Sequence, residues 1–178
     1  LDLAEVVGQP ALALEAWQQL ALKQAFTVGD SEMGLALARR GWALAATLAD
    51  RPELQAEMRL ILAACLLRAR QVEAALVELA AVRATLADRP ELHHIAADWR
   101  YLWGVAAQFT GDWDTAHQLH EETLAQQRLG GGFYGLTTAL YNTANSASFQ
   151  GRHEVALAYA TELVELAERE LAADDYQK

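Results

Sequence analysis

The chain alternates between amphipathic runs of helical length and short breaks of small or polar residues. Alanine and leucine, the strongest helix formers, fill the runs, and only three prolines interrupt them. Four breaks are separated by 41, 41 and 40 residues. The pattern predicts an all-α chain built on a period of about forty residues. The breaks are Gly29-Asp30, Arg70-Gln71, Gly111-Asp112 and Gly151-Arg152.

A repeated heptapeptide supports this period. Leu-Ala-Asp-Arg-Pro-Glu-Leu occurs at residues 48–54 and again at 86–92, an offset of 38 residues. Pro52 and Pro90 in the two copies suit the first turn of a helix, where a missing N–H costs no hydrogen bond. Each period is therefore expected to hold two helices. The first helices are expected at about 10–26, 53–69, 91–109 and 133–149, and their partners at about 31–49, 71–87, 112–129 and 152–171.

Helical hairpins of this kind must stack. A helix of about 17 residues is about 25 Å long and buries one stripe against its partner, so the next hairpin covers the rest of its apolar surface. We predict one right-handed α-solenoid domain over residues 1–178, and a chain without an initiator Met is expected to be a piece of a longer protein. Its four antiparallel hairpins are expected at about 10–49, 53–87, 91–129 and 133–171.

Two segments carry a more specific pattern. Residues 111–116, Gly-Asp-Trp-Asp-Thr-Ala, and 151–156, Gly-Arg-His-Glu-Val-Ala, each lead into a second helix. Together with Trp103-Gly104 and residues 140–145, they resemble the tetratricopeptide repeat family, in particular the long repeats of kinesin light chains and of bacterial sensor-regulator proteins. The resemblance implies a scaffold that binds a protein or peptide, with a DNA-binding or nucleotide-binding domain elsewhere in the parent protein.

The first two hairpins depart from the family pattern. Arg70 replaces the turn glycine of the second hairpin, and Gly34 stands where an alanine is expected in the first. The assignment of these hairpins therefore depends on the spacing of the breaks and on the repeated heptapeptide.

The charge balance narrows the classes of partner. There are 24 acidic and 14 basic residues, a net charge of -10, which repels phosphate backbones and anionic lipid. We expect no direct nucleic-acid binding and no membrane association by this segment. No signal peptide is recognisable, and the single cysteine, Cys65, forms no intramolecular disulfide, so a cytoplasmic protein is predicted. The apolar neighbours of Cys65 predict a buried, inert thiol with a raised pKa.

The first helices of stacked hairpins line the concave side of a solenoid, which is its usual ligand surface. Tyr101 and Tyr141 there offer a rigid apolar face with one polar handle. Asn145 can form two hydrogen bonds to an extended peptide, whereas Asn142 is expected to brace the neighbouring hairpin. The mixed charge disfavours the clamp with which some family members hold a peptide's terminal carboxylate. The candidate groove residues are Lys23, Glu57, Arg68, Asp98, Tyr101, Gln108, Tyr141, Asn145 and Ser148.

One histidine cluster needs a separate interpretation. His117 and His120 share a helix face with Asp114 and Glu121, and such groups can hold zinc. The pattern lacks fixed third and fourth ligands, so hydrogen bonding between helices is the preferred interpretation. We predict no metal site and no cofactor.

The sequence gives little support for catalysis. Residues 130–135 are glycine-rich but lack the Lys-Ser/Thr ending of a phosphate loop. Ser146 and Ser148 lie inside a predicted helix, without a nucleophile elbow. We therefore predict that the chain is not an enzyme but a protein- or peptide-binding module of a larger, bacterial-type transcriptional or signalling regulator. A small-ligand or signalling-peptide sensor and a homo-oligomerisation scaffold stay open as alternatives.

Overall fold

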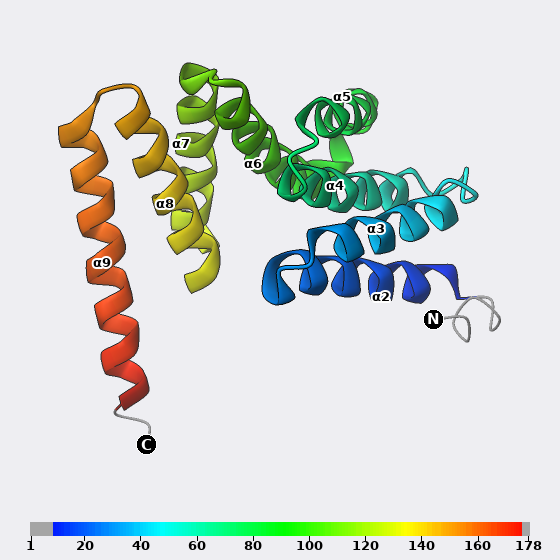
Figure 1. The fold of residues 1–178 in the computed structure, drawn as a ribbon, viewed down its shortest axis with the longest axis horizontal. Coiled ribbons are helices and arrows are strands. Elements are labelled where there is room, and N and C mark those ends of the chain that lie inside the picture. Colours follow the sequence, from blue (N-terminus) through cyan, green and yellow to red (C-terminus); the bar gives the residue numbers. More distant parts are fainter. Residues whose placement is uncertain (1–8, 176–178) are drawn as a thin grey trace. The chain divides into compact units, whose positions relative to one another are not determined.

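The structure, a computed structural model, describes residues 9–175. Over this range the chain forms eight α-helices, one π-helix and one 3-10 helix, and no strand (Figure 1). The prediction of an all-α fold built from helical hairpins is confirmed. The elements in chain order are α2 (Pro10–Leu22), the π-helix η1 (Lys23–Val28), α3 (Ser31–Ala45), α4 (Pro52–Arg68), α5 (Val72–Asp88), the 3-10 helix η2 (Pro90–Leu92), α6 (His93–Thr110), α7 (Trp113–Gly130), α8 (Phe133–Phe149) and α9 (His153–Asp175).

Three helix ends differ from the expected ones. α3 ends at Ala45 and is followed by turns, whereas a helix to residue 49 was expected. The first helix ends in a π-helix, in which the backbone winds more widely. α9 continues to Asp175, whereas an end at residue 171 was expected. All three differences lie at helix ends, where sequence patterns constrain the backbone least.

Each hairpin turns on a residue with a left-handed backbone. Gly29, Gly111 and Gly151 have φ angles of 86°, 79° and 76°, and Arg70 has a φ of 62°. These residues stand at the four predicted breaks, so the period near forty marks one recurring turn geometry. A glycine adopts this conformation without the steric cost that a Cβ brings, whereas Arg70 incurs it.

Three of the four turns close by the same backbone hydrogen bond. The residue after the left-handed one donates its N–H to the carbonyl five residues earlier, at 2.9 Å from Gln71 to Leu66 and at 3.0 Å from Asp112 to Ala107. At the first turn, which follows the π-helix, Asp30 donates to the carbonyl of Gln24, six residues earlier. This bond satisfies a helix-terminal carbonyl that would otherwise lack a partner. Asp112 then starts the next helix, because its side chain accepts from the N–H of Thr115 at 3.2 Å.

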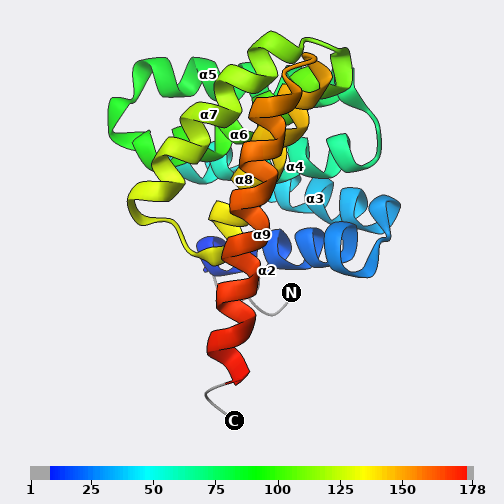
Figure 2. The same cartoon turned by 90° about the vertical axis from the view of Figure 1, so that its left-hand side faces the viewer.

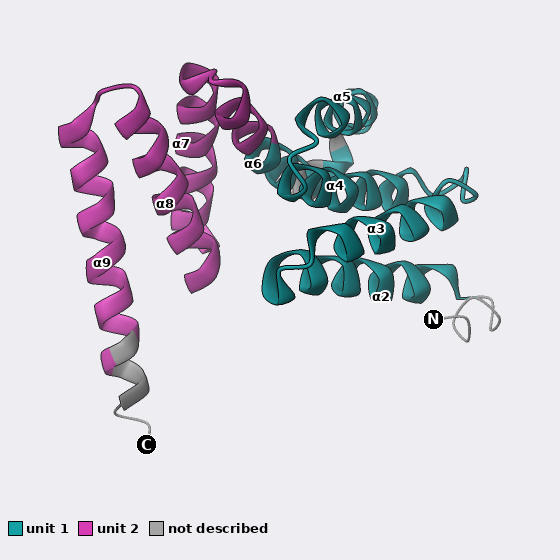
Figure 3. Ribbon diagram, viewed as in Figure 1, with its two compact units in different colours: residues 1–102 teal, residues 103–178 magenta. Residues whose placement is uncertain are grey.

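Contacts between helices divide the chain into two compact units (Figure 3). Unit 1 comprises residues 1–102 and unit 2 residues 103–178, and the boundary falls inside α6. The described residues of each unit have a core of their own. The single domain over residues 1–178 stays a prediction, and its first eight and last three residues lie outside the described range.

The core of unit 1 is formed where α2, α3 and α4 meet. A Cβ built on Gly41 of α3 would lie 2.7 Å from the Met58 sulfur and 3.0 Å from the Cβ of Trp17, so a larger residue would force the helices apart. At the side of α4, the guanidinium of Arg59 lies 3.9 Å from the ring centre of Trp42 and pairs with Glu78 of α5. Burial of apolar side chains and close helix approach therefore hold this unit together.

The α4 helix is the most buried element of unit 1. Residues 62–67 are all buried, and Cys65 among them is fully covered. Burial raises the pKa of the Cys65 thiol to about 11, which confirms the predicted buried thiol and keeps it protonated at neutral pH. Despite such runs, none of the helices in residues 9–175 combines the length and the hydropathy needed to cross a membrane.

Unit 2 packs α8 between α7 and α9. The α9 helix lies along α8 in both views of the molecule (Figure 1 and Figure 2). Leu124, Ala139 and Leu140 form its apolar centre, which Leu163 and Leu166 of α9 cover. At one end the rings of Trp113 and Phe149 stack at 4.1 Å with an interplanar angle of 5°, so the aromatic residue after the Gly-Asp turn fastens α7 to α8.

Candidate binding groove in unit 1

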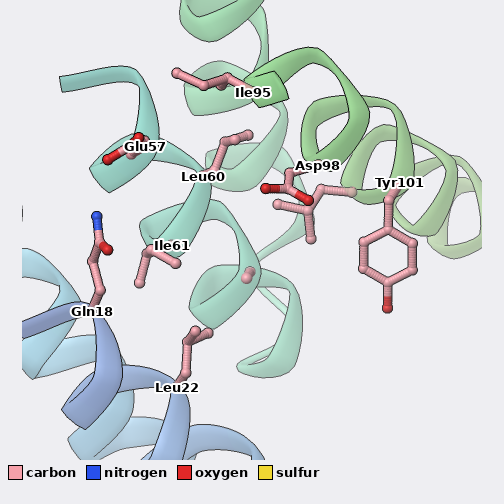
Figure 4. A pocket seen from close by; sticks show the side chains of 10 residues that line it. Gln18, Leu22, Glu57, Leu60, Ile61, Ile95, Asp98 and Tyr101 are labelled. Carbon is pink, nitrogen blue, oxygen red and sulfur yellow. The ribbon is translucent and has the colours of Figure 1, made fainter. Parts of the chain in front are cut away.

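The first helices of three successive hairpins, α2, α4 and α6, line a pocket of about 440 Å³ in unit 1 (Figure 4). Its floor consists of apolar side chains, among them Leu60 and Leu102, which are 4% and 8% exposed. Its walls carry polar side chains, with Gln18 extending from α2 towards Glu57 of α4 (Figure 4). The lining residues of this α2/α4/α6 pocket are Gln18, Leu22, Glu57, Leu60, Ile61, Ala64, Ile95, Asp98, Tyr101 and Leu102.

A second pocket of about 460 Å³ adjoins the first, because Gln18 and Glu57 line both. The α2 and α4 helices alone form this α2/α4 pocket. We refer to the two pockets together as the unit 1 groove. The second pocket is lined by Ala11, Leu12, Leu14, Glu15, Gln18, Gln19, Leu54 and Glu57.

The helical period explains why these residues gather in one groove. On α2 the positions 11, 15, 18 and 22 are three or four residues apart, and on α4 the positions 54, 57, 61 and 64 follow the same spacing. Residues so spaced share one face of a helix. Leu54 lines the pocket that begins at Ala11, and Ile61 the pocket that reaches Leu22, so α2 and α4 run in the same direction.

Three of the nine predicted groove residues line the α2/α4/α6 pocket, namely Glu57, Asp98 and Tyr101. Lys23 and Arg68 are exposed and are absent from the described lining of either pocket. The Nε of Arg68 instead donates to the carbonyl of Ala25 at 3.2 Å and so joins α4 to η1.

Sequence reasoning missed Glu15, Gln18 and Gln19 of α2. Their signal was available, since Glu15 stands three and four residues before Gln18 and Gln19, which places the three polar side chains on one helix face.

The other four predicted residues belong to unit 2. Gln108 is half-buried near the end of α6, and Tyr141, Asn145 and Ser148 lie on α8, where Tyr141 is 59% exposed. Their part in a binding groove stays a prediction.

The expected role of Asn142 needs a correction. This residue is buried, but its amide nitrogen donates to the carbonyl of Thr138 at 2.9 Å, one turn earlier in the same helix. The hydrogen bond therefore supports α8 itself and does not brace a neighbouring hairpin.

A buried polar network joins the helices of unit 2. The Ser146 hydroxyl donates to the Thr143 carbonyl at 3.0 Å, which leaves its oxygen to accept from Nδ1 of His117 at 3.1 Å. On the other side of the imidazole, Nε2 lies 3.4 Å from a carboxylate oxygen of Glu121. The hydroxyl of Tyr159 donates to the same carboxylate oxygen at 3.1 Å, which joins α9 to α7.

Glu121, His117 and Ser146 are the residue types of a catalytic triad, but the buried position of the serine indicates a structural role. Ser146 is 0% exposed and its hydroxyl hydrogen is directed at the Thr143 carbonyl. A nucleophile must reach a substrate, and a fully buried hydroxyl cannot do so without opening the helix pair. The bond from His117 to Ser146 is the hydrogen bond between helices that the sequence predicted for this cluster.

His120 lies beside this network, against α6. A Cβ on Gly104 would lie 2.7 Å from the imidazole Cε1, so the glycine makes room for the ring. Burial, with a smaller contribution from His117, lowers the pKa of His120 to about 4. Within the described part of the chain no three His, Cys, Asp or Glu side chains are grouped so that they could hold a metal ion.

Comparison with known proteins finds a family model that matches part of the chain. Residues 95–169 match the tetratricopeptide repeat family. Two solved structures of kinesin light chain TPR-like repeats from Podosopora anserina are similar over nearly the whole chain. One, a substituted variant, is 17% identical, covers 95% of this chain and 92% of its own, and has a TM-score of 0.58. The other is 18% identical, covers 94% and 91%, and has a TM-score of 0.54. None of the curated proteins matches the sequence.

Proposed function

We propose that this chain, whose residues 95–169 belong to the tetratricopeptide repeat family, binds a protein or peptide segment in the unit 1 groove. Repeats of this family generally mediate protein–protein binding, and the fold is typically a scaffold without a catalytic site. The observation that carries the proposal is the α2/α4/α6 pocket. It joins an apolar floor to polar walls and is lined by the first helices of three hairpins.

We further propose that the chain is part of a larger bacterial-type regulator in the cytoplasm, in which it senses or holds a partner while another domain acts. Its net charge of -10 supports a division of labour in which this segment contacts neither DNA nor an anionic membrane. A gel-shift titration with a random DNA duplex at low salt should show no complex at micromolar protein. A complex that dissolves with added salt would contradict this part of the proposal.

A displayed library of random twelve-residue peptides, selected on the full chain, tests the binding function. We expect the enriched peptides to bind with measurable fluorescence anisotropy and to lose at least tenfold in affinity on Tyr101→Ala or Ala64→Leu. The first change removes an aromatic wall of the pocket and the second narrows it. Tyr141→Ala asks in the same assay whether the predicted residues of unit 2 also contribute.

The matched control is Val77→Ala on α5, a second helix that does not line the groove, where the side chain is 67% exposed. This substitution should change affinity less than twofold. The binding function fails if no peptide is enriched, or if Val77→Ala weakens binding while both groove variants leave it unchanged. Circular dichroism of each variant separates lost binding from lost folding.

A small-ligand sensor is the second candidate function. A volume of about 440 Å³ above an apolar floor falls within the range of small-molecule sites. A specific metabolite or short signalling peptide would raise the melting temperature in proportion to its occupancy. A thermal-shift screen in which a ligand stabilises the wild type and not Ala64→Leu would favour this function over peptide binding.

A homo-oligomerisation scaffold is the third candidate function, and its contact surface would lie on unit 2. Leu157 and Val164 of α9 are 68% and 55% exposed and lie seven residues apart on one helix face. Such a face is available to a second copy of the chain. Light scattering over a dilution series should show a mass that falls on dilution, and Leu157→Lys should shift the equilibrium towards the monomer.

A further inference from the structure

We infer that the outward face of α9 docks an amphipathic helix of a partner protein, whose aliphatic stripe has Lys or Arg along one edge. The α9 helix is the outermost helix of unit 2, and α8 runs along one side of it (Figure 3). Its outward side shares no residue with the unit 1 groove. The α9 face is formed by the exposed residues His153, Glu154, Leu157, Val164, Glu165 and Glu168.

The α9 face is in register with a surface of α7 that packs against the next helix. The turns at Gly111 and Gly151 share a left-handed backbone and are 40 residues apart, so each α9 residue has an α7 counterpart 40 positions earlier. Because both helices begin two residues after these turns, the counterparts occupy the same place on the helix surface. The counterparts of His153, Glu154, Leu157 and Val164 are Trp113, Asp114, His117 and Leu124.

Near the turn, the α7 counterparts hold the end of α8. Trp113 stacks on Phe149 with ring centres 4.1 Å apart, and the carboxylate of Asp114 accepts from the side-chain amide of Gln150 at 2.7 Å. The two α9 residues at these positions are exposed. This end of α9 therefore presents a ring and a carboxylate where α7 uses a ring and a carboxylate to hold a helix.

Farther along, the contrast between the two helices is larger. His117 is hydrogen-bonded to Ser146 of α8 at 3.1 Å, and Leu124 belongs to the apolar centre that α7 shares with α8. These α7 residues are 4% and 2% exposed, whereas Leu157 and Val164 at the same positions of α9 are 68% and 55% exposed. The α9 helix thus exposes two aliphatic side chains at the positions that α7 buries under the next helix.

The first hairpin of unit 1 covers the same positions in the same way. Gly29 stands 82 residues before Gly111, which places Leu35 and Trp42 of α3 at the two positions just compared. Leu35 is 4% exposed, and the ring of Trp42 lies against the guanidinium of Arg59 on α4. In both units the next first helix packs on this surface, so the occupant expected on α9 is a helix.

The centre of the α9 face determines the apolar part of the partner. Leu157 and Val164 are seven residues apart, which is about 10 Å along the helix. At the first of these positions α7 has the imidazole of His117, which needs a hydroxyl on α8, whereas α9 offers only an aliphatic side chain. A partner helix therefore places aliphatic residues over this centre, where both surfaces lose their hydration.

The edge of the α9 face determines the charge of the partner. Glu154 and Glu168 stand three residues before and four residues after the aliphatic pair, so both adjoin it on one helix face, and Glu165 adds a third exposed carboxylate. Arg169, the cation nearest to them in the sequence, directs its Nε to the backbone carbonyl of Glu165 at 3.2 Å. Three carboxylates favour Lys or Arg on the partner and disfavour a second copy of this acidic face.

The test is a library of eighteen-residue peptides on an alanine-based, helix-forming background, displayed and selected on the full chain. The baits are the wild type, the face variant Leu157→Ser/Val164→Ser and the control Val77→Ser, which makes the same kind of change at a 67% exposed residue of α5. We expect the wild type and the control to enrich peptides with aliphatic residues at helical spacing and at least two Lys or Arg. The face variant should not enrich them.

A titration by fluorescence anisotropy measures each part of the contact. One enriched peptide should bind Leu157→Ser/Val164→Ser at least tenfold more weakly than the wild type, Glu165→Lys/Glu168→Lys at least fivefold more weakly, and Val77→Ser within twofold. A proline at the centre of the peptide should weaken binding at least tenfold, because it breaks the helix. Raising the salt concentration from 50 to 300 mM should weaken the complex severalfold.

Four results would overturn the helical partner on α9. They are a selection that enriches nothing, peptides that bind the face variant as well as the wild type, peptides that tolerate the central proline, and a dimer of the wild type that the face variant dissociates in light scattering. The last result would make a second copy the occupant. Peptides weakened by Ala64→Leu and by neither α9 variant are a case of the second result, and they would support the unit 1 groove instead.

Discussion

The two units of the chain stabilise the same hairpin fold with different chemistry. All the buried polar residues identified in residues 9–175 belong to unit 2: His117, His120, Thr123, Asn142, Thr143 and Ser146. Where the structure describes the side chains of unit 1, the buried residues are aliphatic, aromatic or sulfur-containing, together with two glycines. This part of unit 1 is therefore held by the hydrophobic effect, which depends little on pH. Unit 2 is held partly by buried hydrogen bonds and contains the buried imidazole of His120, whose protonation depends on pH.

The two units also differ in what their sequences identify: one carries most of the residues that match the family, and the other carries the candidate binding site. The family match over residues 95–169 falls mainly in unit 2, whereas both pockets of the groove lie in unit 1. The residues that define a repeat family are those that pack the helices together and form the turns. The residues that line a groove lie on the helix face that does not pack against a neighbouring helix, so packing does not restrict their identity.

The largest expected effect comes from a cavity in the apolar core of unit 1. Leu79 of α5 is 0% exposed, and Leu79→Ala should lower the free energy of unfolding by about 3 kcal/mol, because the site loses apolar contacts without a polar group to rearrange. Urea unfolding at pH 7 and pH 5 should give the same loss. A loss that changes by more than about 1 kcal/mol between the two pH values would contradict the apolar character of this unit.

Acid should destabilise unit 2 through His120. In the unfolded chain the imidazole has its ordinary pKa of about 6.5, and in the folded chain burial lowers this pKa to about 4. As the pH falls from about 6.5 to 4, the unfolded state gains a proton that the folded state does not, so stability is progressively lost, by roughly 3 kcal/mol in all. The protection factors of amide hydrogen exchange, which correct for the pH dependence of the intrinsic rate, should therefore fall more in unit 2 than in unit 1 over this range.

His120→Gln supplies the control for the acid effect, because an amide does not titrate in this range. In this variant the protection factors of the two units should fall by nearly the same amount from pH 6.5 to 4. A second acid effect is expected at lower pH in unit 1, where the hydrogen bond from Arg51 lowers the pKa of the half-buried Glu53. An equal loss of protection in both units of the wild type above pH 5 would show that His120 does not control the response.

A smaller effect should come from the hydroxyl that connects α7 to α8. Ser146→Ala leaves Nδ1 of the buried His117 without its acceptor, so we expect a loss of about 1–2 kcal/mol in the free energy of unfolding. Ser148→Ala is the matched control, two residues along the same helix but exposed, and should change stability by less than about 0.5 kcal/mol. Equal losses for the two variants would mean that the network contributes nothing.

The smallest expected effect has the opposite sign. Arg70→Gly removes a Cβ from a left-handed backbone and should stabilise unit 1 by about 0.5–1 kcal/mol. The reciprocal change, Gly111→Arg, should destabilise the corresponding turn of unit 2 by about 1 kcal/mol, since no atom lies within 4 Å of the added Cβ and only the backbone is strained. Melting temperatures should therefore move in opposite directions.

The features that the sequence predicted well are those set by local interactions. The turns at Gly111 and Gly151 follow from a left-handed glycine at the end of a helix, and even Arg70 was located by spacing alone. Glu57 and Asp98 were identified because first helices line the groove. Arg68 does not line either described pocket, since its long side chain donates to the backbone carbonyl of Ala25, which no periodicity encodes.

Features that depend on contacts between distant segments were not predictable. The partner of His117, Ser146, lies 29 residues away on the next helix. The boundary between the two units falls inside α6, where the helical pattern continues without a break in composition. Both depend on how the helices pack, which hydrophobic periodicity constrains only loosely.

The open surroundings of the hairpin turns have a practical consequence. Apart from chain neighbours, no atom lies within 4 Å of the position that a Cβ would occupy at Gly29, Gly111 or Gly151. These turns therefore reverse the chain without packing against other residues at that position. A fluorophore or an epitope inserted next to such a turn would contact neither core. A donor dye beside Gly29 and an acceptor dye beside Gly151 would therefore report changes in the distance between unit 1 and unit 2 by energy transfer while the groove stays unlabelled.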